Sequence, residues 1–76
     1  MIPEFRKPYQ NGELRIGKAT WNEEDRSVKW AYRSRNGGIS PRSPEVPIDV
    51  LCEMMVFALE NGEISKEQKQ RLRSLL

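Results

Sequence analysis

The apolar residues of this chain change their spacing near its middle, and this change restricts the possible folds more than any other feature. Residues 13–35 carry apolar side chains at every second position on either side of a polar loop, which is the spacing of two half-buried strands. Residues 47–59 repeat their apolar side chains at intervals of three and four, which is the spacing of one helix face. A strand pair followed by a helix predicts an α+β fold.

The polar loop Asn22–Arg26 joins the two predicted strands into a β-hairpin over residues 13–35. We predict a register in which Ile16 lies opposite Tyr32. A slip by one residue would divide the apolar side chains between the two faces, so burial favours this pairing. One face then collects the apolar side chains of Leu14, Ile16, Val28, Trp30 and Tyr32.

Two segments without strong periodicity flank the hairpin. Residues 1–12 form an extended N-terminal arm that could add a third, edge strand to the sheet. Residues 36–46 contain two glycines and two prolines and therefore predict an irregular connector.

Residues 47–76 predict a helical hairpin. Pro47 suits the first helical position because its missing N–H would have no partner there. Asn61-Gly62 is typical of a helix end, and Ser65 with Gln68 matches a capping box that begins a second helix. The predicted order is β-β-α-α in one small domain spanning residues 1–76. We expect the first helix to cover the apolar face of the hairpin and the second to fold back as a clasp.

The cysteine and histidine content excludes several kinds of chemistry. Cys52 is the only cysteine, so no intramolecular disulfide can form, and the chain contains no histidine. Catalytic triads, histidine acid–base catalysis and most zinc sites are therefore excluded. The acidic run Glu23–Asp25 lacks the alternating ligands of a calcium loop. We predict a protein that is not an enzyme, with no catalytic residue, no metal site and no cofactor.

The same features predict where the protein works. A thiol without a partner fits a reducing compartment, and we place Cys52 on the inward face of the first helix as a small core residue. No apolar run approaches the roughly 18 residues of a membrane span. We therefore expect a cytoplasmic protein that does not contact a membrane.

The other face of the predicted hairpin is basic. Residues 1–42 carry nine basic and five acidic side chains, whereas residues 43–76 carry four and six, so the chain is basic in front and acidic behind. Arg15 and Arg33 lie opposite each other in the predicted register, and such a like-charge pair costs up to about 1 kcal/mol. Selection for folding alone would favour an acid at one of these positions, which indicates an acidic partner. The candidate binding residues are Arg15, Trp21, Lys29, Arg33, Arg35 and Arg42.

Two functions fit this basic face, and a solvated strand face without a partner is the third interpretation. In the first, the chain is a small regulatory or adaptor protein that docks on an acidic patch of another protein, by analogy with the small inhibitors that phages and mobile elements encode. In the second, the chain is a nucleic-acid-binding module whose cations follow the phosphates while Trp21 stacks on a base. We predict the first function and keep the second as the alternative.

The first predicted helix has more apolar surface than one hairpin can cover. Met54 and Phe57 widen its apolar arc beyond a single face. The second helix could cover this surplus, or the surplus could form an interface with a partner or with a second copy of the chain. Met54 and Phe57 are therefore the candidate residues of an apolar interface.

Overall fold

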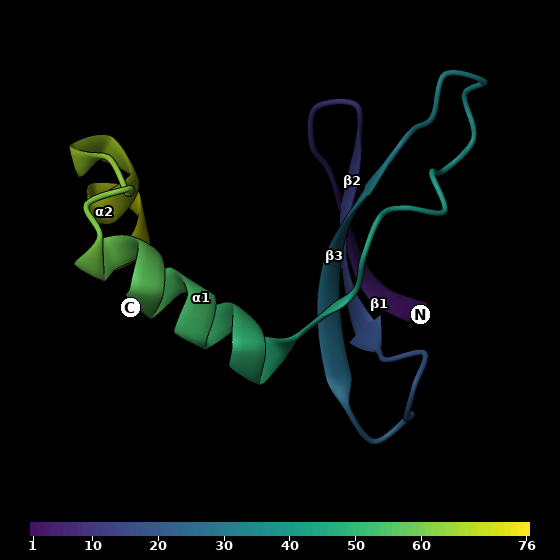
Figure 1. Ribbon diagram of the computed structural model, residues 1–76, viewed down its shortest axis with the longest axis horizontal. Helices are drawn as coiled ribbons and strands as arrows, with labels where there is room; N and C mark the ends of the chain where they lie inside the picture. The colour runs from purple at the N-terminus through teal and green to yellow at the C-terminus, as the bar shows by residue number, and fades with distance from the viewer.

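The computed structural model describes all 76 residues as an antiparallel sheet followed by two helices (Figure 1). The strands are β1 (Ile2–Pro8), β2 (Gly12–Lys18), β3 (Arg26–Tyr32) and β4 (Val46–Pro47), and they lie in the sheet in this order. The helices are α1 (Ile48–Glu60) and α2 (Lys66–Arg73). The α+β class is confirmed, and the N-terminal arm does form an edge strand. The short strand β4 was not predicted, so the order is β-β-β-β-α-α.

The edge strand β1 lies very close to β2. A Cβ atom added at Gly17 would stand 2.1 Å from the carbonyl oxygen of Ile2, far inside any normal contact, so only glycine fits at this position. The pairing is irregular between Pro3 and Phe5, where the register shifts. Prolines at an edge strand remove no essential ladder bond, which is why β1 tolerates both Pro3 and Pro8.

The register of β2 and β3 differs from the predicted one. Ile16 lies opposite Val28 instead of Tyr32, which is a displacement of four residues along β3. The turn between the strands is longer than expected and is closed by a 3.0 Å hydrogen bond from the Ala19 N–H to the carbonyl of Asp25. Because the displacement is an even number, the side chains that are paired in β2 and β3 keep their predicted faces. The alternation of the side chains therefore predicts their faces but not the register of the two strands.

The pairing collects apolar side chains on one side of the sheet, and we call this side the apolar sheet face. It gains Phe5 from β1, which lies directly opposite Ile16. Phe5 remains 64% exposed, and Ile16 and Trp30 are also exposed. The aromatic rings of Tyr9 and Tyr32 pack against Trp30, with centroid distances of 6.3 and 5.2 Å. The apolar sheet face consists of Phe5, Leu14, Ile16, Val28, Trp30 and Tyr32.

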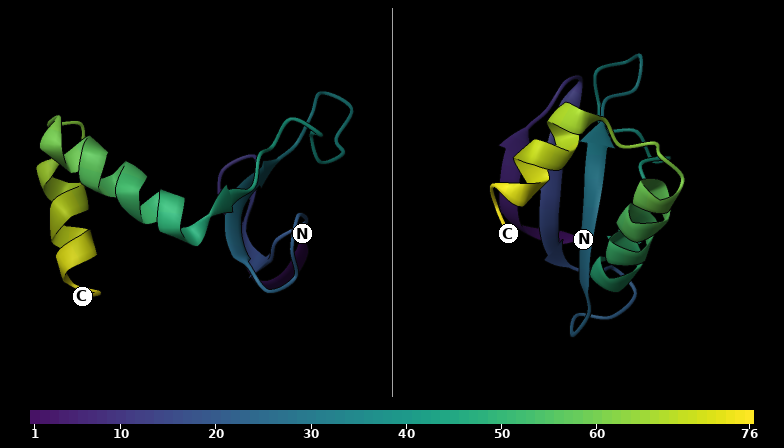
Figure 2. Two further views of the ribbon diagram at one scale, coloured as in Figure 1. Left: turned by 60° about the horizontal axis from the view of Figure 1, so that its bottom comes forward. Right: turned by 90° about the vertical axis from the view of Figure 1, so that its left-hand side faces the viewer.

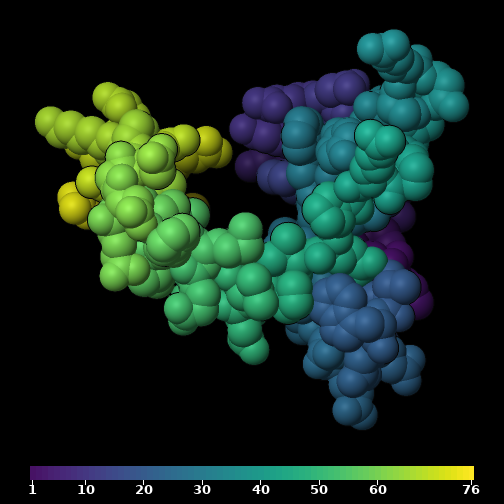
Figure 3. Space-filling view, in the orientation of Figure 1, coloured from purple at the N-terminus to yellow at the C-terminus, as the bar shows by residue number.

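The helices extend away from the sheet and leave this face uncovered. Neither α1 nor α2 contains a buried residue, and the only strands that α1 contacts are β3 and β4. Figure 3 shows open space between the end of the helical segment and the sheet. The only buried apolar residues of the chain are Ala19 and Ala31. The expectation that the first helix covers the hairpin while the second closes over it is therefore wrong for this chain by itself.

The direction of α1 has a local cause at Pro47. This residue pairs with Ser27 in β4, and the helix begins at the next residue without any linker. Pro47 has φ −58° and ψ 141°, so it is an extended N-cap and not the first helical residue as predicted. The proline ring fixes φ and also restricts Val46 to extended conformations. Few free torsions remain that could turn α1 back over its own sheet.

The helix ends agree with the predicted signals. Asn61 is the C-cap of α1, and Gly62 follows with a positive φ of 71°, which glycine adopts at little cost. Ser65 caps α2, and its capping box with Gln68 is complete. Neither helix has the length and apolar character that crossing a lipid bilayer requires.

Candidate protein-binding surfaces

Three cations form a row across the sheet on the side opposite the apolar sheet face. Arg15 lies directly between Arg6 on β1 and Lys29 on β3. The predicted opposition of Arg15 and Arg33 is replaced by this row, because the register is displaced. Arg33 follows β3 on the same side, and its backbone forms an isolated antiparallel β-bridge with Ile39. We call Arg6, Arg15, Lys29 and Arg33 the basic sheet face.

One acid lies within the basic sheet face. The Nε of Arg15 donates a 2.6 Å hydrogen bond to Glu13, and Arg6 stands 4.0 Å from the same carboxylate oxygen. The hydrogen bond from Arg15 lowers the pKa of Glu13, and the positive charges of Arg15, Arg6 and Arg33 lower it further. Glu13 therefore stays ionised and offsets one of the four cations. Lys29 has no ion-pair partner in the chain.

Arg35 and Arg42 lie between β3 and β4 and not on the sheet: Arg35 directly precedes the connector, and Arg42 lies within it. Strand β3 ends at Tyr32, before Arg35, and the connector extends beyond the end of the sheet (Figure 1). The connector is held by its own hydrogen bonds, including one of 2.7 Å from the Ser34 N–H to Gly38 and one of 2.8 Å from the Ser40 N–H to Tyr32. Both arginines are exposed. They add positive charge near the sheet without belonging to the cation row.

Trp21 lies in the turn between β2 and β3, among acidic side chains. Its ring N–H donates a 2.8 Å hydrogen bond to Asp25, and the indole is half exposed. The side chain lines a shallow pocket together with Glu24, Asp49 and Ile48. The turn thus holds Trp21 at the start of α1, in a setting that repels phosphate more than it attracts it.

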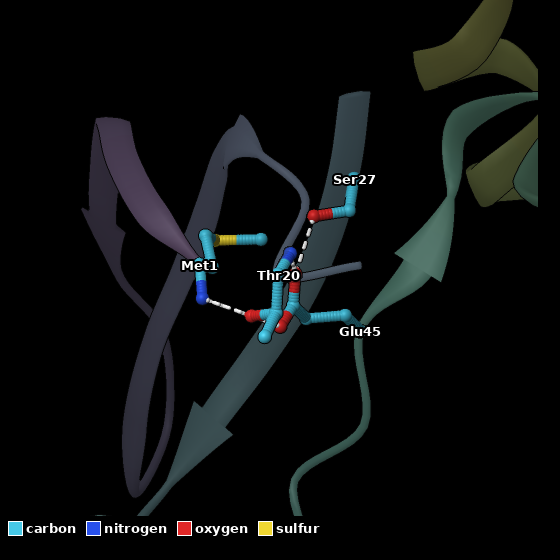
Figure 4. A network of polar contacts seen from close by, with 4 residues as sticks. All are labelled: Met1, Thr20, Ser27 and Glu45. Atoms are coloured by element: carbon cyan, nitrogen blue, oxygen red, sulfur yellow. Dashed lines mark hydrogen bonds and ion pairs between the residues drawn. The ribbon is translucent and has the colours of Figure 1, made fainter. Parts of the chain in front are cut away.

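A polar network that sequence reasoning missed joins four distant segments (Figure 4). Glu45 accepts a 3.1 Å hydrogen bond from the Thr20 N–H and a 2.9 Å hydrogen bond from the Ser27 hydroxyl. The Met1 ammonium lies 3.3 Å from the other carboxylate oxygen, and the Thr20 hydroxyl contacts both groups. No local pattern marked Glu45, because its partners come from elsewhere in the chain.

The network keeps Glu45 ionised. Burial alone would raise the pKa of this carboxyl, but the hydrogen bonds from the Thr20 hydroxyl, Ser27 and the Thr20 N–H, together with the Met1 ammonium, lower it to about 2. Because Glu45 directly precedes β4, the network attaches the strand that carries α1 to the rest of the sheet.

The apolar candidates on α1 are exposed. Phe57 is 69% exposed and Met54 52%, and Val50 and Val56 are also exposed. Helix α2 lies beside a different side of α1, where Met55 and Leu59 line shallow pockets together with Leu72. Cys52 is exposed, so its prediction as a core residue is wrong. The second helix therefore does not cover the surplus apolar surface.

The chain thus offers a basic sheet face, an apolar sheet face and an apolar helix surface. No group of three or more histidine, cysteine, aspartate or glutamate side chains is placed to hold a metal ion. No protein family, curated protein or solved structure matches the chain. Its function must therefore be argued from these three surfaces.

Proposed function

We propose that this chain is a small non-enzymatic regulatory or adaptor protein that binds another protein through its basic sheet face. The observation that carries the proposal is the row of Arg6, Arg15 and Lys29 across three neighbouring strands. Like charges placed directly opposite each other destabilise a sheet, so this row opposes folding. An acidic patch on a partner protein would remove that repulsion on binding.

The surroundings of the row favour a protein over a nucleic acid. Single-stranded nucleic acid is usually held by cations with aromatic rings beside them. Trp21, the ring expected to fill that role, is bonded to Asp25 and lies near Glu24 and Asp49. The basic sheet face therefore has the cations of a nucleic-acid site without its stacking platform.

Charge reversal at Lys29 tests the proposal. Proteins captured by the wild-type chain would be compared with those captured by Lys29→Glu, and Lys66→Glu on α2 is the matched control with the same charge change. We expect at least one partner that the wild type and Lys66→Glu retain and that Lys29→Glu loses, because Lys29 has no ion-pair partner within the chain. If Lys29→Glu retains every partner, the proposal fails.

A parallel titration with single- and double-stranded oligonucleotides at about 50 and 200 mM salt tests the alternative. Phosphate contacts release counterions, so binding to nucleic acid should weaken steeply as the salt concentration rises. Salt-sensitive binding that Lys29→Glu abolishes and Lys66→Glu keeps would replace the proposed function with nucleic-acid binding.

The same substitution should affect folding in the opposite direction to binding. Lys29→Glu turns a cross-strand repulsion with Arg15 into an attraction, so we expect the free energy of unfolding to rise by about 0.2–1 kcal/mol. Chemical denaturation of the wild type and Lys29→Glu measures this change. A loss of stability would show that Lys29 stabilises the folded chain. It would contradict the inference that the row of cations opposes folding.

A further inference from the structure

The chain exposes far more surface than a folded monomer of its size. Its accessible surface is 6366 Å², whereas the scaling relation for monomeric proteins gives about 4,800 Å² for its mass. Its radius of gyration is 13.9 Å, whereas a compact chain of this length should have about 11.4 Å. The surplus surface is therefore roughly 1,500 Å² per chain.

Much of the exposed apolar surface belongs to two surfaces that do not cover each other. Phe5, Ile16 and Trp30 are exposed on the apolar sheet face, and Met54 and Phe57 are exposed on α1. Soluble monomers rarely leave large contiguous apolar patches open to water. Each surface has the chemical character that the other needs as a partner.

The geometry keeps these two surfaces apart within one chain. Arg26 shares a pocket with Ile48 and Asp49, and its place in β3 puts it on the apolar side of the sheet, so α1 leaves the sheet on that side. Pro47 then directs α1 outward, and the helices and the sheet form the two sides of an open V (Figures 1 and 2). Closing the V within one chain would require torsions that Pro47 restricts.

We propose that a second copy of this chain fills the V, with the helices of each copy packed on the apolar sheet face of the other. A two-fold axis would make the two contacts identical, so both copies would cover both surfaces at once and the assembly would close as a dimer. If each copy buries its surplus of roughly 1,500 Å², the interface totals roughly 3,000 Å², which lies within the range of obligate homodimers.

Charge complementarity supports a second copy as the occupant. Helix α1 carries Asp49, Glu53 and Glu60 and no basic residue. The apolar sheet face is flanked by Lys7 and Lys18, which share the side of Leu14 and Ile16. None of these five charged side chains has an ion-pair partner within the chain. An exchange of helices between two copies brings the free acids toward the free lysines.

This inference does not rest on the proposed function, because it uses the opposite side of the sheet. Lys29→Glu should leave the dimer intact even where it abolishes partner binding. Failure of one proposal therefore leaves the other standing.

The first test is the mass of the full chain in solution, by light scattering and small-angle X-ray scattering over a concentration series. We expect a particle of twice the 8.9 kDa chain mass with a radius of gyration near 15 Å. A monomer at all concentrations would overturn the proposal, whether its radius of gyration is about 11 Å, as for a closed chain, or about 14 Å, as for an open one.

The second test uses charge reversal to show which surfaces meet. One variant carries Lys7→Glu and Lys18→Glu on the sheet, and the other carries Asp49→Lys and Glu53→Lys on the helix. Each variant alone should dimerise about tenfold more weakly than the wild type, because every repulsion occurs twice in a symmetric dimer. Mixed together, they should form a heterodimer of wild-type affinity, because both contacts then join opposite charges.

The control for mixing is a second pair of variants, Lys66→Glu and Glu63→Lys, each of which reverses one charge away from the exposed apolar residues of α1 and of the sheet. The dissociation constant of the dimer should be the same for each of these two variants alone and for their mixture. If the two reversed variants form no heterodimer when mixed, the exchange of helices is wrong even where the wild type is a dimer.

Discussion

The sheet and the helices of this chain differ in what holds them. The sheet is joined by paired strands, a close glycine contact and the Glu45 network, which link residues far apart in the sequence. The helices are held by caps within a few residues of themselves and by shallow side-chain contacts with each other. Isolated helices as short as these are marginal in water. The sheet is therefore stabilised by contacts between distant segments, whereas the helices depend mainly on local ones.

The largest expected effect breaks the sheet. Gly17→Ala places a Cβ 2.1 Å from the Ile2 carbonyl oxygen, so β1 must move away from β2. We expect a loss of about 3 kcal/mol in the free energy of unfolding, measured by chemical denaturation. Gly38→Ala is the control, because its Cβ would meet only the Asn36 side chain at 3.7 Å. Equal stability of the two variants would contradict the close approach of β1.

The next effect concerns the helices and their predicted partner surface. Phe57→Glu places a charge at the only aromatic residue of α1, which is 69% exposed, and we expect it to weaken the proposed dimer by about 2 kcal/mol, as at an interface hot spot. Sedimentation measures the dissociation constant, and circular dichroism should show a loss of helix when the dimer dissociates. Ile39→Glu on the connector is the matched control. An unchanged dissociation constant for Phe57→Glu would show that Phe57 does not lie in the interface of the dimer.

A smaller effect tests the network that joins the two regions. The pKa of Glu45 is about 2 in the folded chain against 4.5 for the free side chain, so the unfolded chain takes up the proton first as the pH falls. The stabilisation is complete above about pH 4.5 and is lost as the pH falls toward 2. Allowing for solvent screening, we expect roughly 1–2 kcal/mol.

Thermal unfolding of the wild type and Glu45→Gln between pH 6 and pH 2 measures this contribution. The two proteins should differ above pH 5 and converge near pH 2. Glu23→Gln in the exposed turn is the control. A constant difference across the range would assign the stability to packing and not to the charge of Glu45.

The smallest effect is local to α2. Ser65→Ala removes the hydroxyl that accepts the Gln68 N–H and should destabilise the helix by about 1 kcal/mol. Helix content by circular dichroism should fall, while the strand pairs, followed by amide hydrogen exchange, should stay protected. Loss of protection in β2 would contradict the independence of the two regions. Ser74→Ala at the C-cap of α2, which removes only the hydroxyl donor to the Arg71 carbonyl, is the comparison and should cost less.

The faces of β2 and β3 could be predicted from the sequence, but their register could not. Alternation placed Ile16 and Val28 on one face, and any even displacement keeps that result. Arg15 therefore lies on the predicted face of the sheet, but the residue opposite it on β3 is Lys29 instead of the predicted Arg33. Met54 and Phe57 were identified as surplus apolar residues, and both are exposed. Trp21 could not be placed, because the turn that directs it is built from hydrogen bonds of its own.

The sequence by itself determined the features that depend on a few neighbouring residues. These are the alternation of each strand, the capping box at Ser65 and the helix end at Asn61-Gly62. Their signals lie within one turn of a helix or a few residues of a strand, so periodicity and capping rules suffice to find them.

Only the tertiary structure decided how these elements meet. It set the register of β2 and β3, joined Glu45 to Met1, Thr20 and Ser27, and aligned Arg15 with two other cations. It also turned α1 outward at Pro47, where strand and helix share one junction. Each result depends on contacts between distant segments or on one backbone angle. The spacing of side chains along the sequence predicts neither of these.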